Sequence, residues 1–213
     1  MMRIKLVVSG LVALFLGLII IRNDEVLHTN IKYVLTDYMV NTEHANLMIG
    51  SSSIARLNPA LINHCGKWIN RGIGNSQLKD VIRYVLYSPN KTLDNILIYA
   101  GENDVSYGLS IKQTVDRYKE LLIGILKRHP DTLIHVLAIK SSPKRQSYWA
   151  AFRQVNLEIE AYVRSHTNIY FYHSSHLHNE NTLHDYYQSD GIHLNTLGYL
   201  HFINGFSEQC KKR

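Results

Sequence analysis

The sequence lacks several of the patterns that identify common classes of protein. Its 213 residues include only two cysteines, and they show no internal repeat, zinc-finger spacing or heptad pattern. The net charge of +6 is not concentrated, since the only compact basic run is the terminal Lys211-Lys212-Arg213, which we interpret as a solvated tail. We therefore expect no binding of nucleic acid, and weak attraction to anionic lipid explains the charge better. With 46% hydrophobic and 19% charged residues, the composition is that of a folded protein.

The two cysteines, Cys65 and Cys210, leave the redox state open. In an oxidising compartment a bridge between them is allowed, but sequence cannot show whether their Cα atoms come close enough. Two unpaired, partly buried thiols are the alternative.

The longest uncharged apolar run lies at the N-terminus, between Lys5 and Arg22. It covers residues 6–21 and is close to the lower limit of about 17–25 residues for a spanning helix. A cleaved signal peptide is the alternative, but residues 18–21 offer no small-residue cleavage site. We expect residues 1–25 to be a signal anchor, with a transmembrane helix at about 4–21. The basic N-terminal end stays in the cytoplasm, which places the remaining domain on the extracytoplasmic side of the membrane.

The rest of the chain alternates between apolar runs and amphipathic segments. Residues 26–44 are predicted to be a connector, helical around 31–39, and residues 45–213 to be one domain. Five runs predict strands: 45–49, 67–70, 95–100, 133–139 and 168–172. Helical segments separate them, with Ser76 and Ser110 as expected helix caps and Pro130 as a stop signal. This order predicts a doubly wound α/β sandwich whose parallel sheet is covered on both faces.

Polar and glycine-rich clusters follow three of the predicted strands, at residues 50–52, 70–75 and 101–104. In doubly wound sheets, ligands bind beyond the carboxyl ends of the strands. We therefore expect the three clusters to converge on one edge of the sheet.

These clusters contain the parts of a serine-based site. Ser52 lies where a strand becomes a helix, so that the first helical N–H groups can face an oxyanion. Asp190 and His193, three residues apart, can supply a base and its orienting carboxylate. The side-chain amide of Asn103 can donate to the same oxyanion. Taken singly, each has a structural alternative: a helix cap, a surface loop or a turn residue.

Four blocks carry a resemblance to a known family: Gly50-Ser51-Ser52, Asn70-Arg71-Gly72-Ile73-Gly74-Asn75, Gly101-Glu102-Asn103-Asp104 and Asp190-Gly191-Ile192-His193. In this order, each beyond a predicted strand or just before the last helix, they resemble the blocks of the SGNH or GDSL hydrolases. The similarity covers about residues 45–206. Ser51 stands where the family name has Asp, a familiar variation.

The resemblance implies a flavodoxin-like three-layer α/β/α sandwich and a serine esterase or lipase-like activity that requires no metal and no organic cofactor. By position, Ser52 is the nucleophile, His193 the general base and Asp190 its orienting carboxylate. The oxyanion hole comprises the Ser52 N–H and the Asn103 side chain. A further N–H belongs to Asn75, where the family has glycine, or alternatively to Gly74.

We therefore expect a membrane-anchored carboxylic-ester hydrolase acting on an acetylated carbohydrate or a lipid acyl ester. An envelope O-acyltransferase with the same triad is the alternative, and a catalytically silent binding module is a third. The expected partners are the small-molecule, glycan or lipid ester and the membrane; sequence fixes neither the acyl length nor the oligomeric state. Glu102 and Asp104 are expected to shape the turn rather than to cleave glycosides.

Two further groups of residues are expected near the site. The loop of residues 173–188 contains four histidines, His173, His176, His178 and His184, whose spacing fits no standard zinc pattern. We interpret it as a solvated loop that influences substrate choice. Tyr148, Trp149 and Phe152 either line the substrate pocket or belong to the core.

Overall fold

The computed structural model describes residues 24–40, 44–174, 177 and 183–210. The predicted transmembrane helix at about 4–21 lies outside this part of the chain. Among the described residues, no helix has both the length and the apolar character needed to span a membrane.

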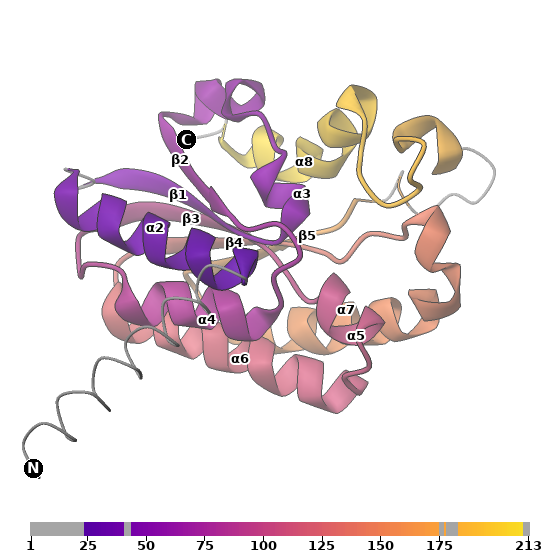
Figure 1. Cartoon of the computed structure of the whole chain (residues 1–213), viewed down its shortest axis with the longest axis horizontal. Helices are drawn as coiled ribbons and strands as arrows, with labels where there is room; N and C mark the ends of the chain where they lie inside the picture. The colour runs from indigo at the N-terminus through magenta and orange to yellow at the C-terminus, as the bar shows by residue number, and fades with distance from the viewer. Residues whose placement is uncertain (1–23, 41–43, 175–176, 178–182, 211–213) are drawn as a thin grey trace, which may run out of the picture.

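The predicted five-stranded parallel sheet is confirmed (Figure 1). Its strands, in spatial order, are β2 (Trp68–Gly72), β1 (Ala45–Gly50), β3 (Leu93–Tyr99), β4 (Leu133–Leu137) and β5 (Ile169–Tyr172). All neighbouring pairs run parallel. The order 2-1-3-4-5 is that of flavodoxin-like folds, in which the strand order reverses between β1 and β3.

Helices cover both faces of the sheet, so the central strands are buried on both sides. On one face lie α4 (Leu78–Tyr87), α6 (Ile111–Arg128) and α7 (Trp149–Val163), packed in a row (Figure 1). On the other lie α3 (Ser52–Ala55), the 3-10 segment η1 (Pro59–Cys65) and α8 (Thr196–Cys210). The apolar side chains of residues 47–49 in β1 and 96–99 in β3 are buried between these two layers.

Residues 26–39 of the predicted connector belong to a helix that packs on this domain. Helix α2 (Glu25–Met39) begins at Asp24, whose carboxylate accepts a hydrogen bond from the Leu27 N–H at 2.9 Å, and it packs against α4. The buried Asp37 carboxylate lies 2.6 Å from the Arg71 guanidinium and also accepts from the Tyr84 hydroxyl. The predicted boundary at residue 45 therefore separates a helix from the domain on which it packs. Apolar periodicity did not reveal this contact because the buried side chains of α2 are polar.

Of the two predicted helix caps, one is confirmed and the other is wrong. Ser110 caps α6 as expected, because its hydroxyl accepts from the Gln113 N–H at 3.2 Å. Ser76 does not cap α4; that position belongs to Gln77, whose N–H donates to the Asp80 carboxylate at 3.0 Å. The Ser76 hydroxyl instead donates to the Gly50 carbonyl. A short helix that was not predicted, α5 (Glu102–Ser106), follows β3 directly.

Candidate active site

The turn from β1 into α3 holds Ser52 at the carboxyl edge of the sheet. Gly50 has φ +143°, and a Cβ at this position would lie 1.9 Å from the Tyr99 carbonyl oxygen, so only glycine fits. The next residue, Ser51, donates its N–H to that same carbonyl at 3.0 Å. Helix α3 then begins at Ser52, whose N–H therefore belongs to the first turn, where no carbonyl of the same helix accepts it.

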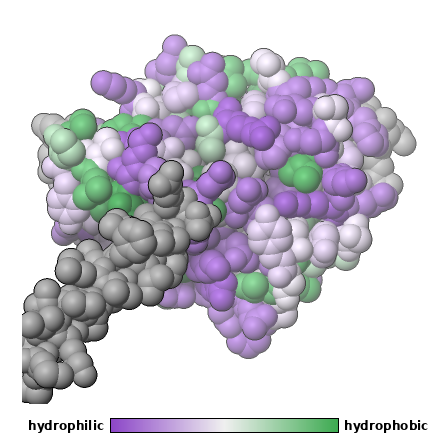
Figure 2. All heavy atoms as spheres, in the orientation of Figure 1, coloured by the Kyte–Doolittle hydropathy of each residue, from purple (hydrophilic) through white to green (hydrophobic). Residues whose placement is uncertain are grey.

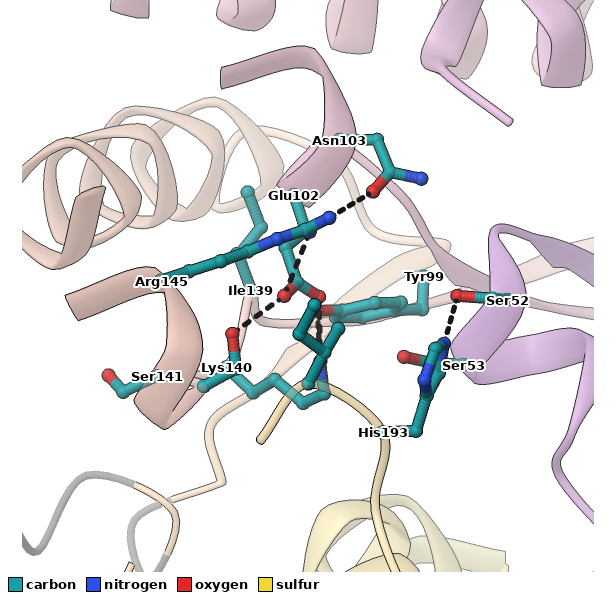
Figure 3. A network of polar contacts seen from close by, with 12 residues as sticks. Ser52, Ser53, Tyr99, Glu102, Asn103, Ile139, Lys140, Ser141, Arg145 and His193 are labelled. Carbon is teal, nitrogen blue, oxygen red and sulfur yellow. Dashed lines mark hydrogen bonds and ion pairs between the residues drawn. The ribbon is translucent and has the colours of Figure 1, made fainter. Parts of the chain in front are cut away.

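The loop before α8 brings His193 to this serine. The Nε2 atom of His193 lies 2.9 Å from the Ser52 Oγ atom, although the two residues are 141 positions apart (Figure 3). Backbone contacts fix the loop: Gln188 donates its N–H to the His193 carbonyl at 2.7 Å, and Lys144 donates to the Gly191 carbonyl at 3.0 Å. The backbone that carries the imidazole is therefore held at His193 and at Gly191.

Asp190 completes the line of contacts behind the imidazole. Its Oδ2 atom lies 2.6 Å from His193 Nδ1, and its Oδ1 atom accepts from the backbone N–H groups of Ile192 and His193, each at 2.9 Å. Burial opposes ionisation of this carboxyl, but the hydrogen bonds from His193 and Ile192 outweigh it and lower the pKa of Asp190. The group is thus an anion at neutral pH, and it favours the tautomer of His193 with a proton on Nδ1.

The second and third clusters also reach this edge. Asn103 is buried, and its Nδ2 atom donates to the Ser76 carbonyl at 2.8 Å. The loop containing Ser76 is joined to the end of β1, because the Ile73 N–H donates to the Gly50 carbonyl at 2.9 Å. An amide nitrogen carries two N–H bonds, so the contact with Ser76 leaves a second one for another acceptor. The predicted convergence of the three loops is therefore observed.

The structure places the two alternative backbone donors side by side on the surface of this loop. Asn75 has φ +58°, in the left-handed region that asparagine tolerates better than most residues. Gly74 is also exposed, and a Cβ built on it would meet no atom within 4 Å. Both residues remain candidates for donating an N–H group to the oxyanion.

A buried cluster of charged residues lies behind Asn103, and sequence reasoning missed it (Figure 3). The Glu102 carboxylate lies 2.6 Å from the Lys140 ammonium and 3.1 Å from the Arg145 guanidinium. It also accepts from the hydroxyls of Tyr99 and Ser142. Burial disfavours the charge on Glu102, but Lys140 and Arg145 outweigh this and lower its pKa, while burial lowers the pKa of Lys140. The one signal in the sequence was a lysine directly after the apolar run that ends at Ile139.

The other candidate residues that the structure describes make their contacts elsewhere. Trp149 and Phe152 are buried in the core, whereas Tyr148 is partly exposed and stacks on Phe152. His173 contacts Glu160 on α7 at 3.0 Å, and His184 lies in the 3-10 segment η4 (Leu183–Tyr186). His176 and His178 fall outside the described residues. Within the described part of the chain, no three His, Cys, Asp or Glu residues form a group that could hold a metal ion.

The fold and these contacts define a class: an α/β sandwich with a serine, an imidazole and a carboxylate in line at the carboxyl edge of its sheet. The model of the GDSL-like lipase/acylhydrolase family matches residues 50–200, and the chain belongs to this family. The resemblance noted in the sequence is thereby confirmed. No curated protein matches the chain.

Solved structures share the fold at low sequence identity. A GDSL-like lipase from Bacteroides thetaiotaomicron is 18% identical, with a TM-score of 0.70 over 86% of this chain and 97% of that one. A carbohydrate esterase family 3 protein from Talaromyces cellulolyticus is 17% identical, with a TM-score of 0.65 over 79% and 97%. The catalytic domain of peptidoglycan O-acetyltransferase A from Streptococcus pneumoniae is 15% identical, with a TM-score of 0.57 over 81% and 95%.

Proposed function

We propose that the protein is a serine hydrolase that cleaves carboxylic esters through an acyl-enzyme on Ser52. The observation that carries the proposal is the unbroken line of contacts from Ser52 Oγ through the His193 ring to the Asp190 carboxylate, at 2.9 and 2.6 Å. A neutral imidazole beside a serine hydroxyl can take its proton, and a carboxylate on the far side stabilises the imidazolium that forms.

In the first half of the reaction, Ser52 Oγ forms a bond to the ester carbonyl carbon while its proton moves to His193 Nε2. The negative charge on the carbonyl oxygen is stabilised by the Ser52 N–H, the Asn103 amide and the N–H of Asn75 or Gly74. The bond to the alcohol oxygen then breaks, and His193 gives its proton to that oxygen. In the second half, His193 deprotonates a water molecule, which attacks the acyl carbon. The bond from that carbon to Ser52 Oγ then breaks, and His193 returns the proton to Oγ as the acid leaves.

The substrate class that we propose is an acetylated carbohydrate or a lipid acyl ester. It is supported by the family of the chain and by a fold shared with a lipase and with a carbohydrate esterase. Residues 173–188 run directly into Asp190, so this loop is well placed to influence which ester is chosen.

An acyltransferase is the second candidate, and the shared fold with a peptidoglycan O-acetyltransferase domain favours it. Both activities pass through the same acyl-enzyme and differ only in whether water or a sugar hydroxyl accepts the acyl group. Product analysis with p-nitrophenyl acetate, with and without an oligosaccharide acceptor, separates them. A transferase yields acetylated sugar in place of free acetate.

A panel of p-nitrophenyl esters of increasing chain length tests the proposal. The wild type should release p-nitrophenol, and Ser52→Ala should not, at equal folded content by circular dichroism. The chain-length profile then separates an acetyl esterase from a lipase. Equal hydrolysis by both proteins would remove the proposed nucleophile.

We also propose that residues 6–21 anchor the protein in a membrane, with the domain on the extracytoplasmic side. The support is the uncharged apolar run and its basic N-terminal flank. Extraction of isolated membranes with alkaline carbonate tests this, because an anchored chain stays with the lipid. Recovery of the full-length chain in the soluble fraction would contradict it.

A further inference from the structure

Arg145 and the Ser76 carbonyl together fix the orientation of the Asn103 amide. The Arg145 Nη2 atom donates to Asn103 Oδ1 at 2.9 Å (Figure 3). A guanidinium carries only donors, so the atom of the amide that faces it must be the oxygen. The nitrogen must then face the other way, where one of its N–H bonds reaches the Ser76 carbonyl at 2.8 Å. With the amide reversed, two donors would face each other at Arg145 and two acceptors at Ser76.

Arg145 is itself held by the buried carboxylate of Glu102, the residue before Asn103. Its Nη1 atom lies 3.1 Å from Glu102 Oε1, and only 13% of its side chain is exposed. Glu102 in turn is fixed by Lys140, which is fully buried, and by the Ser142 hydroxyl. A planar guanidinium can contact two neighbouring acceptors at once, which a lysine ammonium on its flexible stem does less well.

Two cations share one carboxylate in this cluster, since Lys140 and Arg145 both pair with Glu102. Arg145 contacts the amide oxygen of Asn103, so its charge draws electron density away from the amide nitrogen. Hydrogen-bonded groups in a chain polarise one another in this way, which strengthens the N–H as a donor. The effect is greatest when a full negative charge develops on the acceptor, as in an oxyanion.

We propose that Arg145 is a positioning residue for the oxyanion donor: together with the Ser76 carbonyl it fixes the Asn103 amide with its nitrogen on the side away from the guanidinium. Arg145 also polarises this amide, and Glu102 and Lys140 hold Arg145 in place. This inference rests on the proposed function, because it concerns the oxyanion hole of the same site. It assigns to Arg145, in the 3-10 segment η2 (Pro143–Tyr148), a role in turnover rather than in binding of the ester.

A double-mutant cycle on the full-length protein with p-nitrophenyl acetate tests this role. Asn103→Ala should lower kcat by about a hundredfold or more, as expected for the loss of one oxyanion donor. Arg145→Ala should lower kcat by roughly tenfold to a hundredfold, with KM changed less than threefold, because the amide keeps its contact with Ser76 but loses the cation that holds its oxygen and polarises it. The double variant should be no slower than Asn103→Ala alone, since Arg145 acts through that amide. Arg153→Ala, which removes an exposed arginine on α7, is the matched control and should keep the wild-type rate.

Chemical rescue supplies a readout that a purely structural role would not move. Guanidinium at millimolar concentration should restore part of the kcat of Arg145→Ala, whereas equal concentrations of sodium chloride should not. If Arg145→Ala fails to fold, Arg145→Lys decides the question: it keeps the charge, and at an unchanged melting temperature it should still lose several-fold in kcat.

Three results would overturn the inference: a wild-type kcat in Arg145→Ala, a wild-type kcat in folded Arg145→Lys where Arg145→Ala does not fold, or losses that multiply fully in the double variant. Each of these results overturns the inference if Ser52→Ala, measured in the same assay, is inactive. Activity that persists in Ser52→Ala would instead overturn the proposed function, so the two failures are distinguishable.

Discussion

The buried pair of Glu102 and Lys140 makes the most quantitative prediction about stability. Lys140→Met replaces the fully buried ammonium by an apolar side chain of similar length and leaves Glu102 with its other donors. Breaking a buried ion pair by removing one partner typically costs about 3–5 kcal/mol. Here Arg145, Ser142 and Tyr99 still contact the carboxylate, so we expect the lower end, about 3 kcal/mol.

The assays are thermal unfolding and urea unfolding, both followed by circular dichroism. A domain of this size loses about 2–4 °C in Tm for each kcal/mol, so Lys140→Met should melt about 6–12 °C below the wild type, with an unchanged urea m-value. Lys112→Met is the matched control, because Lys112 pairs with Asp116 on the exposed surface of α6. This variant should have the melting temperature of the wild type. Equal stability of Lys140→Met and wild type would refute the reasoning about this cluster.

The same cluster predicts how stability depends on pH. The pKa of Glu102 is lowered in the folded state, because Lys140 and Arg145 outweigh the effect of burial. The folded protein therefore binds the proton less readily than the unfolded chain, and the stabilisation is present above the unfolded value near 4.5. It is lost as the pH falls through the lower folded value. Wild-type stability should thus fall more steeply below pH 4.5 than that of Glu102→Gln, and parallel curves would contradict this assignment.

Three further predictions concern the framework of the site. A Cβ on Gly72 would lie 2.2 Å from backbone of α3, so Gly72→Ala should cost about 1–3 kcal/mol in thermal unfolding, while Gly74→Ala, with open space, should stay within about 0.5 kcal/mol. Asp37→Ala leaves the Arg71 guanidinium without its ion-pair partner and should lower the free energy of unfolding in urea by about 3 kcal/mol. A change under about 1 kcal/mol would mean that the contact of α2 does not stabilise the domain. Asp190→Asn should lower kcat by about 10⁴ with an unchanged melting temperature, and near-normal turnover would remove its orienting role.

Much of the fold was predictable because its signals are local. Each strand is a short apolar run with turn residues beside it, and Ser110 and Pro130 mark the ends of a long helix. The contact between α2 and the domain was not predictable, because it depends on Asp37 meeting Arg71 from another element. Local sequence shows which side chains are polar but not which polar side chains are buried together.

The candidate site likewise has a part that the sequence predicts and a part that it does not. Ser52, Asn103, Asp190 and His193 lie in short blocks with recognisable order, and the topology of a parallel sheet explains why such blocks meet. Arg145 and Lys140 lie in no such block. Their importance arises from burial beside Glu102, which is a property of the packed structure.

The central claim, that Ser52 is a nucleophile activated by His193, is tested most directly by covalent labelling with a sulfonyl fluoride. The Ser52 oxygen displaces fluoride, and peptide mass mapping locates the adduct. We predict one adduct on Ser52 that is suppressed by an ester substrate, an unchanged yield in Ser53→Ala, which removes the neighbouring hydroxyl, and a much slower reaction in His193→Ala. An adduct at another residue, or labelling of Ser52→Ala to the same extent as wild type, would contradict the account.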